Sequence, residues 1–201
     1  MSQYLRGSDV LYLTQWDKIK DKISIRFKCL IIFYRLIFRF LIPFTGKYFV
    51  DNLQLKYDLI KKYKIDRNRF IYLSHHPEKM TIAKRPHKTF NILFYMPNLS
   101  TKNNPNLIRW IYGYWELLKI DAALGDYCDI KIIYYDGQKD FWNCIELTDF
   151  YIRPNNWDGG STLVRLCEKN NIPFYHSKRG ICEPEAIESI LYYYHRWKNE
   201  K

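Results

Sequence analysis

The stretch from Asp149 to Ser177, which reads DFYIRPNNWDGGSTLVRLCEKNNIPFYHS, decides the fold that this sequence predicts. It opens with three β-forming residues (150–152) and reaches Pro154, which cannot continue a central strand. An amphipathic helix follows, and residues 172–175 form a second β-forming run. Because strand, helix and strand fill so short a stretch, we expect two parallel neighbouring strands joined by a right-handed crossover.

The turn before this helix has the composition of an anion site. Asp158, Gly159 and Gly160 precede Ser161 and Thr162, either of which can cap the helix. The two glycines permit positive φ angles and a close approach of a ligand to the backbone. Since unpaired N–H groups and the helix dipole favour negative charge at a helix N-terminus, a phosphate would fit there. The alternative is that the glycines form a turn and nothing more.

The rest of the chain alternates between strand and helix patterns in the same way. We expect further strands at 9–13, 47–51, 69–73, 90–96 and 129–135, and helices at 18–44, 53–64, 107–124, 138–146 and from Glu183 to Trp197. A polar linker with two prolines lies between 75 and 89. The sequence thus predicts an α/β protein: a Rossmann-like domain at 81–201, with a parallel sheet flanked by helices, preceded by an incomplete α/β part at 1–80.

Composition and charge narrow the function classes. The 201 residues are 47% hydrophobic and 18% aromatic, which excludes a disordered chain. The net charge of +11 is uneven, with 19 Lys/Arg against 7 Asp/Glu in residues 1–89 and 13 against 14 in residues 90–201. A basic N-terminal part indicates an anionic partner, either a membrane surface, an acidic substrate or a nucleic acid, or else only a solvated surface. Nucleic acid is the least favoured partner, because no helix-turn-helix, zinc-finger or RNA-binding signature accompanies the charge.

Cysteine usage and the N-terminus predict a cytoplasmic protein. The five cysteines are an odd number without a C-x-x-C pair, so we expect reduced core residues with no disulfide framework and no metal site. The first ten residues, MSQYLRGSDV, lack the charged region and apolar block of a signal peptide.

Residues 18–44 form the segment that favours a membrane surface. Its apolar part, CLIIFYRLIFRFLIPF from Cys29, is interrupted by Arg35 and Arg39 and is shorter than the roughly 20 apolar residues that span a bilayer. At helical spacing Lys20 and Lys28 fall on the same side as the two arginines. One interpretation is a basic amphipathic helix at an anionic membrane surface, which gives peripheral attachment. The other is a core helix whose arginines extend to solvent.

Taken together, residues 45–190 resemble the nucleotide-sugar glycosyltransferases of the GT-B fold, specifically the retaining enzymes of family 4. Members carry a strand that ends in Pro, an acid followed by Gly, a helix, and a strand that opens on Ile-Pro or Val-Pro. Pro154, Asp158-Gly159 and Ile172-Pro173 match that order. Residues 47–73 are similar to the piece that joins the two domains of such enzymes, and residues 90–96 to the first strand of their donor-binding domain.

The resemblance implies transfer of a sugar from a nucleotide-diphosphate donor to a lipid-linked or protein acceptor, with retention of anomeric configuration. It implies no metal and no cofactor beyond the donor, which agrees with the lack of Asp-x-Asp in the chain. The implied site residues are Asp158 and Arg165 as the catalytic residues, with Gly159, Gly160, Ser161, Thr162 and Lys102 binding the donor.

Two departures from the family pattern support a second hypothesis. The family's second donor-site acid falls at Leu166, and Glu168 lies two positions further on, about 200° round the helix. Family members are also roughly twice as long, with an N-terminal acceptor domain whose catalytic His has no counterpart in His75 or His76. The alternative is therefore a non-catalytic sugar-nucleotide-binding or accessory subunit, completed by another copy or by a partner chain.

Overall fold

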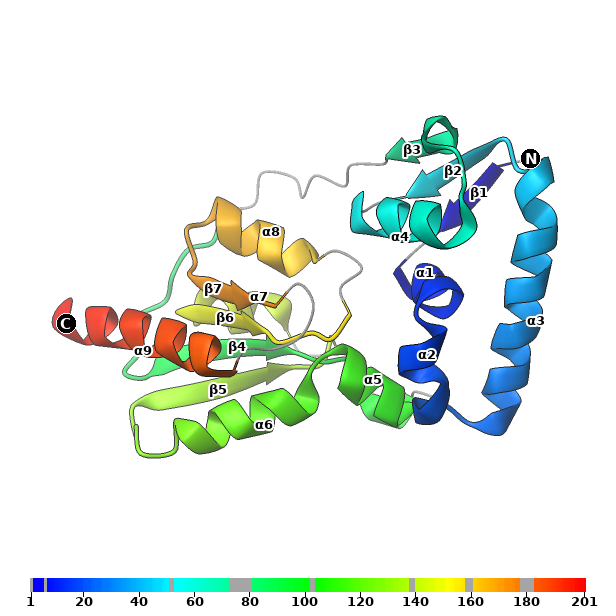
Figure 1. Cartoon of the computed structure of the whole chain (residues 1–201). Coiled ribbons are helices and arrows are strands. Elements are labelled where there is room, and N and C mark those ends of the chain that lie inside the picture. Colours follow the sequence, from blue (N-terminus) through cyan, green and yellow to red (C-terminus); the bar gives the residue numbers. More distant parts are fainter. Residues whose placement is uncertain are drawn as a thin grey trace. The chain divides into compact units, whose positions relative to one another are not determined.

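The computed structural model describes residues 2–5, 7–50, 53–72, 81–101, 104–137, 140–157, 161–177 and 183–201. The chain divides into two compact units, Met1–His76 (unit 1) and Pro77–Lys201 (unit 2). Each unit contains a parallel sheet flanked by helices, so the protein is of mixed α/β type (Figure 1). This is the architecture that the alternating sequence pattern predicts.

Unit 1 has a three-stranded parallel sheet in the order β1-β2-β3. Its strands are β1 (Ser2–Leu5), β2 (Lys47–Val50) and β3 (Phe70–Tyr72). Its helices are α1 (Gly7–Thr14), α2 (Trp16–Ile19), α3 (Ile25–Leu41) and α4 (Leu53–Tyr63), with 3₁₀ turns at Lys20–Lys22, Ile42–Phe44 and Arg67–Arg69. Buried apolar side chains from α1, β2 and α4 form its core, among them Leu11, Leu13, Tyr48, Leu55 and Leu59.

The prediction of a strand at 9–13 is wrong, because these residues belong to α1 and the first strand is β1. The apolar run is short enough to fit either the strand or the helix period. Here the chain is helical: the Gln15 N–H donates to the Leu11 carbonyl at 2.9 Å, and the side-chain Oγ1 of Thr14 donates to the Val10 carbonyl at 2.7 Å. The helix predicted over 18–44 is also shorter than expected. Ser24 has an extended backbone and accepts a hydrogen bond from the Phe27 N–H, so α3 begins only at Ile25.

Unit 2 has a four-stranded, fully parallel sheet in the order β5-β4-β6-β7. Its strands are β4 (Phe90–Tyr95), β5 (Ile130–Tyr135), β6 (Phe150–Arg153) and β7 (Phe174–His176). Its helices are α5 (Pro105–Ile111), α6 (Tyr114–Ala123), α7 (Phe141–Glu146), α8 (Thr162–Lys169) and α9 (Glu183–Asn199), with a 3₁₀ turn at Leu99–Thr101. The predicted β6–α8–β7 crossover is confirmed, and β6 ends where Pro154 requires it to end.

Helices cover both faces of this sheet (Figure 1). Side chains alternate along a strand, so Ile92 and Phe94 of β4 join one apolar cluster while Leu93 joins the other. The first cluster includes Leu117 and Ile120 of α6 and Ala186, Ile190 and Tyr194 of α9. The second includes Cys144 and Ile145 of α7 and Val164, Leu166 and Cys167 of α8. The sheet is therefore doubly wound.

The single helix predicted at 107–124 is two helices, α5 and α6, which separate at Gly113. Gly113 has a φ of 66°, a left-handed conformation that breaks the helix. A Cβ atom at this position would lie 1.6 Å from the Pro154 carbonyl oxygen, so the break sits directly against the end of β6. Asn156 secures the same junction, since its N–H donates to the Ile111 carbonyl at 3.1 Å.

The described cysteines are free thiols, two of them buried and two exposed. Cys144 and Cys167 are buried free thiols as expected, whereas Cys29 and Cys128 are exposed, so the expectation of core positions is wrong for these two. Cys182 lies outside the described residues. Within the described ranges, no helix is both long and apolar enough to cross a membrane. The same ranges contain no group of three or more His, Cys, Asp or Glu placed to hold a metal ion.

Candidate functional site

The candidate site lies at the carboxyl edge of the sheet in unit 2. The chain leaves β4 toward α6 on one face and leaves the neighbouring β6 toward α8 on the other. Neighbouring strands with connections on opposite faces form a topological switch point, where open α/β sheets bind ligands. A cavity of about 590 Å³ lies at this edge. Its lining residues are Tyr95, Tyr112, Tyr135, Gly137, Phe141, Arg153, Ser161, Thr162, Leu163 and Leu166.

Arg153 provides the positive charge of this cavity. It is the last residue of β6 and is only 8% exposed, yet it lines the cavity. Its Nη1 donates to the Tyr151 hydroxyl at 3.5 Å. A guanidinium in a poorly solvated position attracts an anion more strongly than one in bulk water, and it can bind two oxygens of a phosphate at once.

The first turn of α8 lies on the same cavity. Ser161, one of the two caps that the sequence allows, is the N-cap, and its Oγ accepts a hydrogen bond from the Val164 N–H at 3.2 Å. The N–H groups of Thr162 and Leu163 belong to the first turn of α8, where a helix has no backbone acceptors of its own for its N–H groups. Together with the helix dipole they add partial positive charge to that of Arg153.

Aromatic rings form one wall of the cavity. The ring of Tyr95 meets that of Tyr112 edge to face, with centroids 5.4 Å apart, and lies 5.5 Å from the ring of Tyr135. The ring of Phe141 continues the wall at 5.5 Å from Tyr135. Planar aromatic surfaces of this kind stack against nucleobases and cover the apolar faces of sugar rings.

Burial raises the pKa of two hydroxyl groups of this wall, those of Tyr112 and Tyr135. Burial, with a contribution from Tyr95, raises the pKa of Tyr112 to about 12, while Arg153 opposes the rise. Burial likewise raises the pKa of Tyr151 and of Tyr135. Neutral tyrosines can donate hydrogen bonds to ligand oxygens. Among the described residues that line the cavity, Arg153 is therefore the charged one, which gives the site a positive character.

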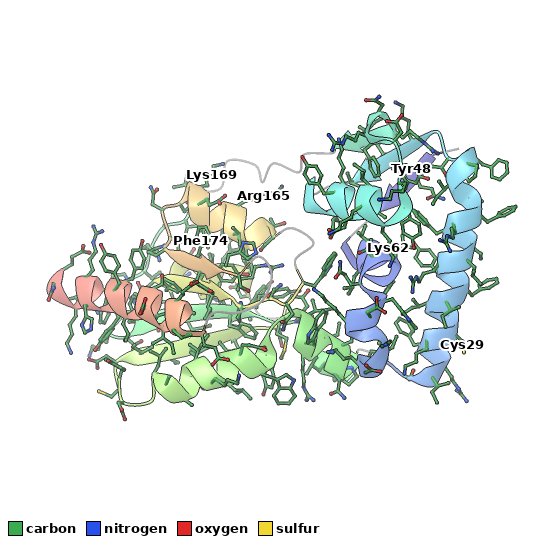
Figure 2. All side chains as sticks on the ribbon, in the orientation of Figure 1. Cys29, Tyr48, Lys62, Arg165, Lys169 and Phe174 are labelled. Atoms are coloured by element: carbon green, nitrogen blue, oxygen red, sulfur yellow. The ribbon has the colours of Figure 1, made fainter. Side chains whose placement is uncertain are left out.

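The predicted site residues fall into three groups. Ser161 and Thr162 line the cavity, whereas Asp158, Gly159, Gly160 and Lys102 lie outside the described residues. Arg165 is not among the residues that line the cavity; it lies on α8 one turn before Lys169 (Figure 2). Its assignment as a phosphate-binding residue stays a prediction.

Leu166 and Glu168, the two positions compared with the family's second acid, lie on different cavities. Leu166 is 3% exposed and lines the carboxyl-edge cavity with an apolar side chain. Glu168 is exposed and lines a different cavity, of about 660 Å³, together with Phe90 and Pro173 from the amino edge of the sheet. Glu168 therefore does not contribute to the carboxyl-edge cavity.

The sequence analysis missed Arg153 as a site residue. The available signal was an Arg at the end of a fully apolar strand, immediately before a proline and next to a switch point. A charge at the carboxyl end of a buried strand is expensive unless it meets an anion or a dipole. That signal identifies a position, but only the packing of Tyr95 and Ser161 around it reveals a cavity.

Comparison with known proteins adds no assignment. No family model matches this chain, and a search of curated proteins finds no sequence that matches it.

Proposed function

We propose that unit 2 binds the diphosphate group of a nucleotide sugar in the carboxyl-edge cavity and that the protein is a glycosyltransferase of GT-B type. One observation carries the proposal: a buried Arg153 and the N-terminal turn of α8 line a single tyrosine-walled cavity at the switch point. The positive groups suit a diphosphate, and the aromatic wall suits a base or a sugar. The resemblance to family 4 supplies the reaction class.

The cavity supports a transfer reaction through charge stabilisation. When the sugar leaves, negative charge grows on the diphosphate, and fixed positive groups stabilise that charge without reorganising. Arg153 and the α8 amides provide this effect, and the tyrosine hydroxyls donate further hydrogen bonds. Asp158 would orient the donor sugar, with Gly159 and Gly160 beside the phosphates and with Arg165 and Lys102 as further cations. The acceptor would be a lipid-linked or protein group, and the configuration would be retained.

The test is calorimetry of the full chain with uridine, guanosine and adenosine diphosphate sugars. We expect one nucleotide to bind clearly, and Arg153→Gln to weaken that binding about tenfold to a hundredfold, since hydrogen bonds to charged groups contribute about 1.5–3 kcal/mol. Lys169→Gln is the matched control, because it removes one positive charge from α8 outside the cavity, and it should bind as wild type does.

The fold of each variant is checked by thermal unfolding, because Arg153 is buried. If no nucleotide diphosphate sugar binds, the proposal is wrong. It is equally wrong if a folded Arg153→Gln protein binds the donor as tightly as wild type. Arg165→Gln tests the sequence-based assignment of that residue separately.

A second candidate function is donor binding without catalysis, as in an accessory subunit. Leu166 favours it, because a buried leucine lines the cavity at the position where the family pattern has its second acid. The two functions differ in turnover. Release of free sugar or transfer to an added acceptor supports the enzyme, whereas tight binding with neither reaction supports the accessory subunit.

A further inference from the structure

Helix α3 of unit 1 is apolar on two opposite sides. Its inner side packs on the unit, where Ile31 and Phe38 are buried and the Phe38 ring lies 5.1 Å from that of Tyr63. Its other side carries large apolar side chains that are 40–78% exposed. We call this set the outer face of α3; its members are Ile25, Leu30, Ile32, Phe33, Leu36, Ile37 and Phe40, with Phe44 in the turn that follows.

An outer face of this kind is unusual on a helix that already has a buried side. Helices that cover a core normally present charged residues to solvent on the opposite side. Here the exposed apolar residues span about 160° of the helix at 100° per residue. A contiguous apolar patch of this width marks a surface that contacts another apolar phase or partner.

Positive charge borders the outer face. Lys28, Arg35 and Arg39 fall within about 40° of one another on α3, between the buried side and the outer face. No Asp or Glu occurs between Asp21 and Asp51, and unit 1 as a whole has 15 Lys/Arg against 6 Asp/Glu. The partner of this surface must therefore be apolar in one layer and negatively charged in the next.

A small cavity is lined both by apolar residues of the outer face and by basic residues of its border. It has a volume of about 280 Å³ and is lined by Ile32, Arg35, Leu36 and Arg39 of α3 and by Lys62 and Tyr63 of α4. Lys62 comes from α4 and is labelled in Figure 2. Three cations thus surround one cavity, while Ile32 and Leu36 belong to both the cavity and the outer face. This combination suits a phosphate group attached to an apolar chain.

We propose that unit 1 docks on an anionic phospholipid surface through the outer face of α3, with a lipid phosphate bound between Arg35, Arg39 and Lys62. The apolar side chains enter the boundary between headgroups and acyl chains, and α3 lies parallel to the membrane plane. A second copy of the chain fits less well, because a symmetric contact through this face would bring two basic borders together. The surface lies within unit 1, so the inference does not rest on nucleotide binding by unit 2.

The experiment is vesicle flotation of the full chain. Vesicles of phosphatidylcholine alone are compared with vesicles in which one third of the lipid is phosphatidylglycerol. We expect binding to the anionic vesicles only, and weaker binding as salt rises. Phe33→Ser with Phe40→Ser should weaken binding about a hundredfold or more, since each phenylalanine loses most of its burial energy. Arg35→Gln with Arg39→Gln should weaken it about twentyfold.

Matched controls come from the same unit. Lys61→Gln with Arg67→Gln removes two exposed positive charges outside the cavity, and Tyr57→Ser removes an aromatic ring that is 54% exposed on α4. Both control proteins should bind anionic vesicles to within about a fewfold of wild type, because these residues belong neither to the cavity nor to the outer face and electrostatic attraction falls off within a Debye length of the membrane. Inorganic phosphate should release no more of the bound protein than sodium chloride of the same ionic strength does, because it supplies no acyl chain.

Three results would overturn the proposal. The first is equal binding to neutral and anionic vesicles, or to neither. The second is release of the protein by inorganic phosphate beyond what sodium chloride of the same ionic strength causes, which would make the cavity a site for a free anion. The third is a stable dimer in sedimentation velocity that the Phe33→Ser, Phe40→Ser protein loses, together with no vesicle binding, which would assign the outer face to a second copy.

Discussion

The charge of Arg153 acts on a neighbouring hydroxyl of the carboxyl-edge cavity. Burial and the neighbouring Tyr95 raise the pKa of Tyr112 and Arg153 lowers it, with a net result of about 12. The hydroxyl is neutral at physiological pH, as an ordinary tyrosine is, and the shift delays its ionisation in alkaline solution. A cavity whose hydroxyls are neutral and whose guanidinium is charged is suited to anions across the whole physiological pH range.

This shift predicts a loss of stability in alkaline solution. The folded state holds the Tyr112 proton to about pH 12, whereas the unfolded chain releases it near pH 10. Between these values the unfolded state binds fewer protons, so the free energy of unfolding falls as pH rises, by about 3 kcal/mol in total. This fall in the free energy of unfolding is measured by urea unfolding of the wild-type and Tyr112→Phe proteins from pH 8 to 12. The variant should show a shallower alkaline decline, and parallel declines would contradict the prediction.

At the scale of elements, the contact between the α5–α6 break and the end of β6 fixes the shape of the cavity. Tyr112, immediately before the break, and Arg153, at the end of β6, both line the cavity. The break depends on Gly113, which combines a left-handed φ with a backbone that touches the Pro154 carbonyl. A side chain at this position would push two cavity-forming elements apart.

Gly113→Ala should therefore destabilise unit 2 strongly. The new Cβ would lie 1.6 Å from a backbone oxygen, so either helix or strand must move, and the left-handed φ adds strain. We expect the free energy of unfolding to fall by about 3 kcal/mol or more, measured by urea denaturation. Gly125→Ala is the control. Its Cβ would meet the Ala122 carbonyl oxygen at 3.3 Å, so its cost should stay near about 1 kcal/mol or less. Equal costs would contradict this account.

The same elements show how far sequence alone can go. The β6–α8–β7 unit was predictable because Pro154, the Ser161 cap and the apolar period of α8 all indicate the same structure. The α1 helix was not, because its apolar run fits a strand as well as a helix and tertiary packing decides between them. The break at Gly113 was missed because it depends on a contact with Pro154, which lies far away in the sequence.

In the candidate site, too, residues with local sequence signals were predictable and residues that depend on tertiary packing were not. Ser161 and Thr162 were predictable because a capped helix after a strand has local signals. Arg153 was not selected, because its value as a ligand-binding group arises from burial beside Tyr95 and Tyr112, and burial is a property of the folded sheet. The tyrosine wall has no sequence signature, since tyrosines in strands usually serve the core.

At the scale of the whole molecule, the two units differ in net charge and in the kind of surface that they present. Unit 1 has 15 Lys/Arg against 6 Asp/Glu and contains the outer face of α3, whereas unit 2 has 17 against 15 and contains the carboxyl-edge cavity. Unit 2 also has its own apolar clusters on both faces of its sheet. The two proposals thus assign membrane attachment to unit 1 and ligand binding to unit 2.

A fragment of residues 77–201 tests this division. Its two apolar clusters are internal, so we expect a single cooperative urea transition. It should bind the nucleotide diphosphate sugar that the full chain binds, to within about a fewfold, because the described cavity residues all lie in unit 2. It should also fail to float with phosphatidylglycerol vesicles. A folded fragment that binds vesicles would contradict the assignment of membrane attachment to α3, whereas a folded fragment without nucleotide affinity would show that residues of unit 1 are required for donor binding.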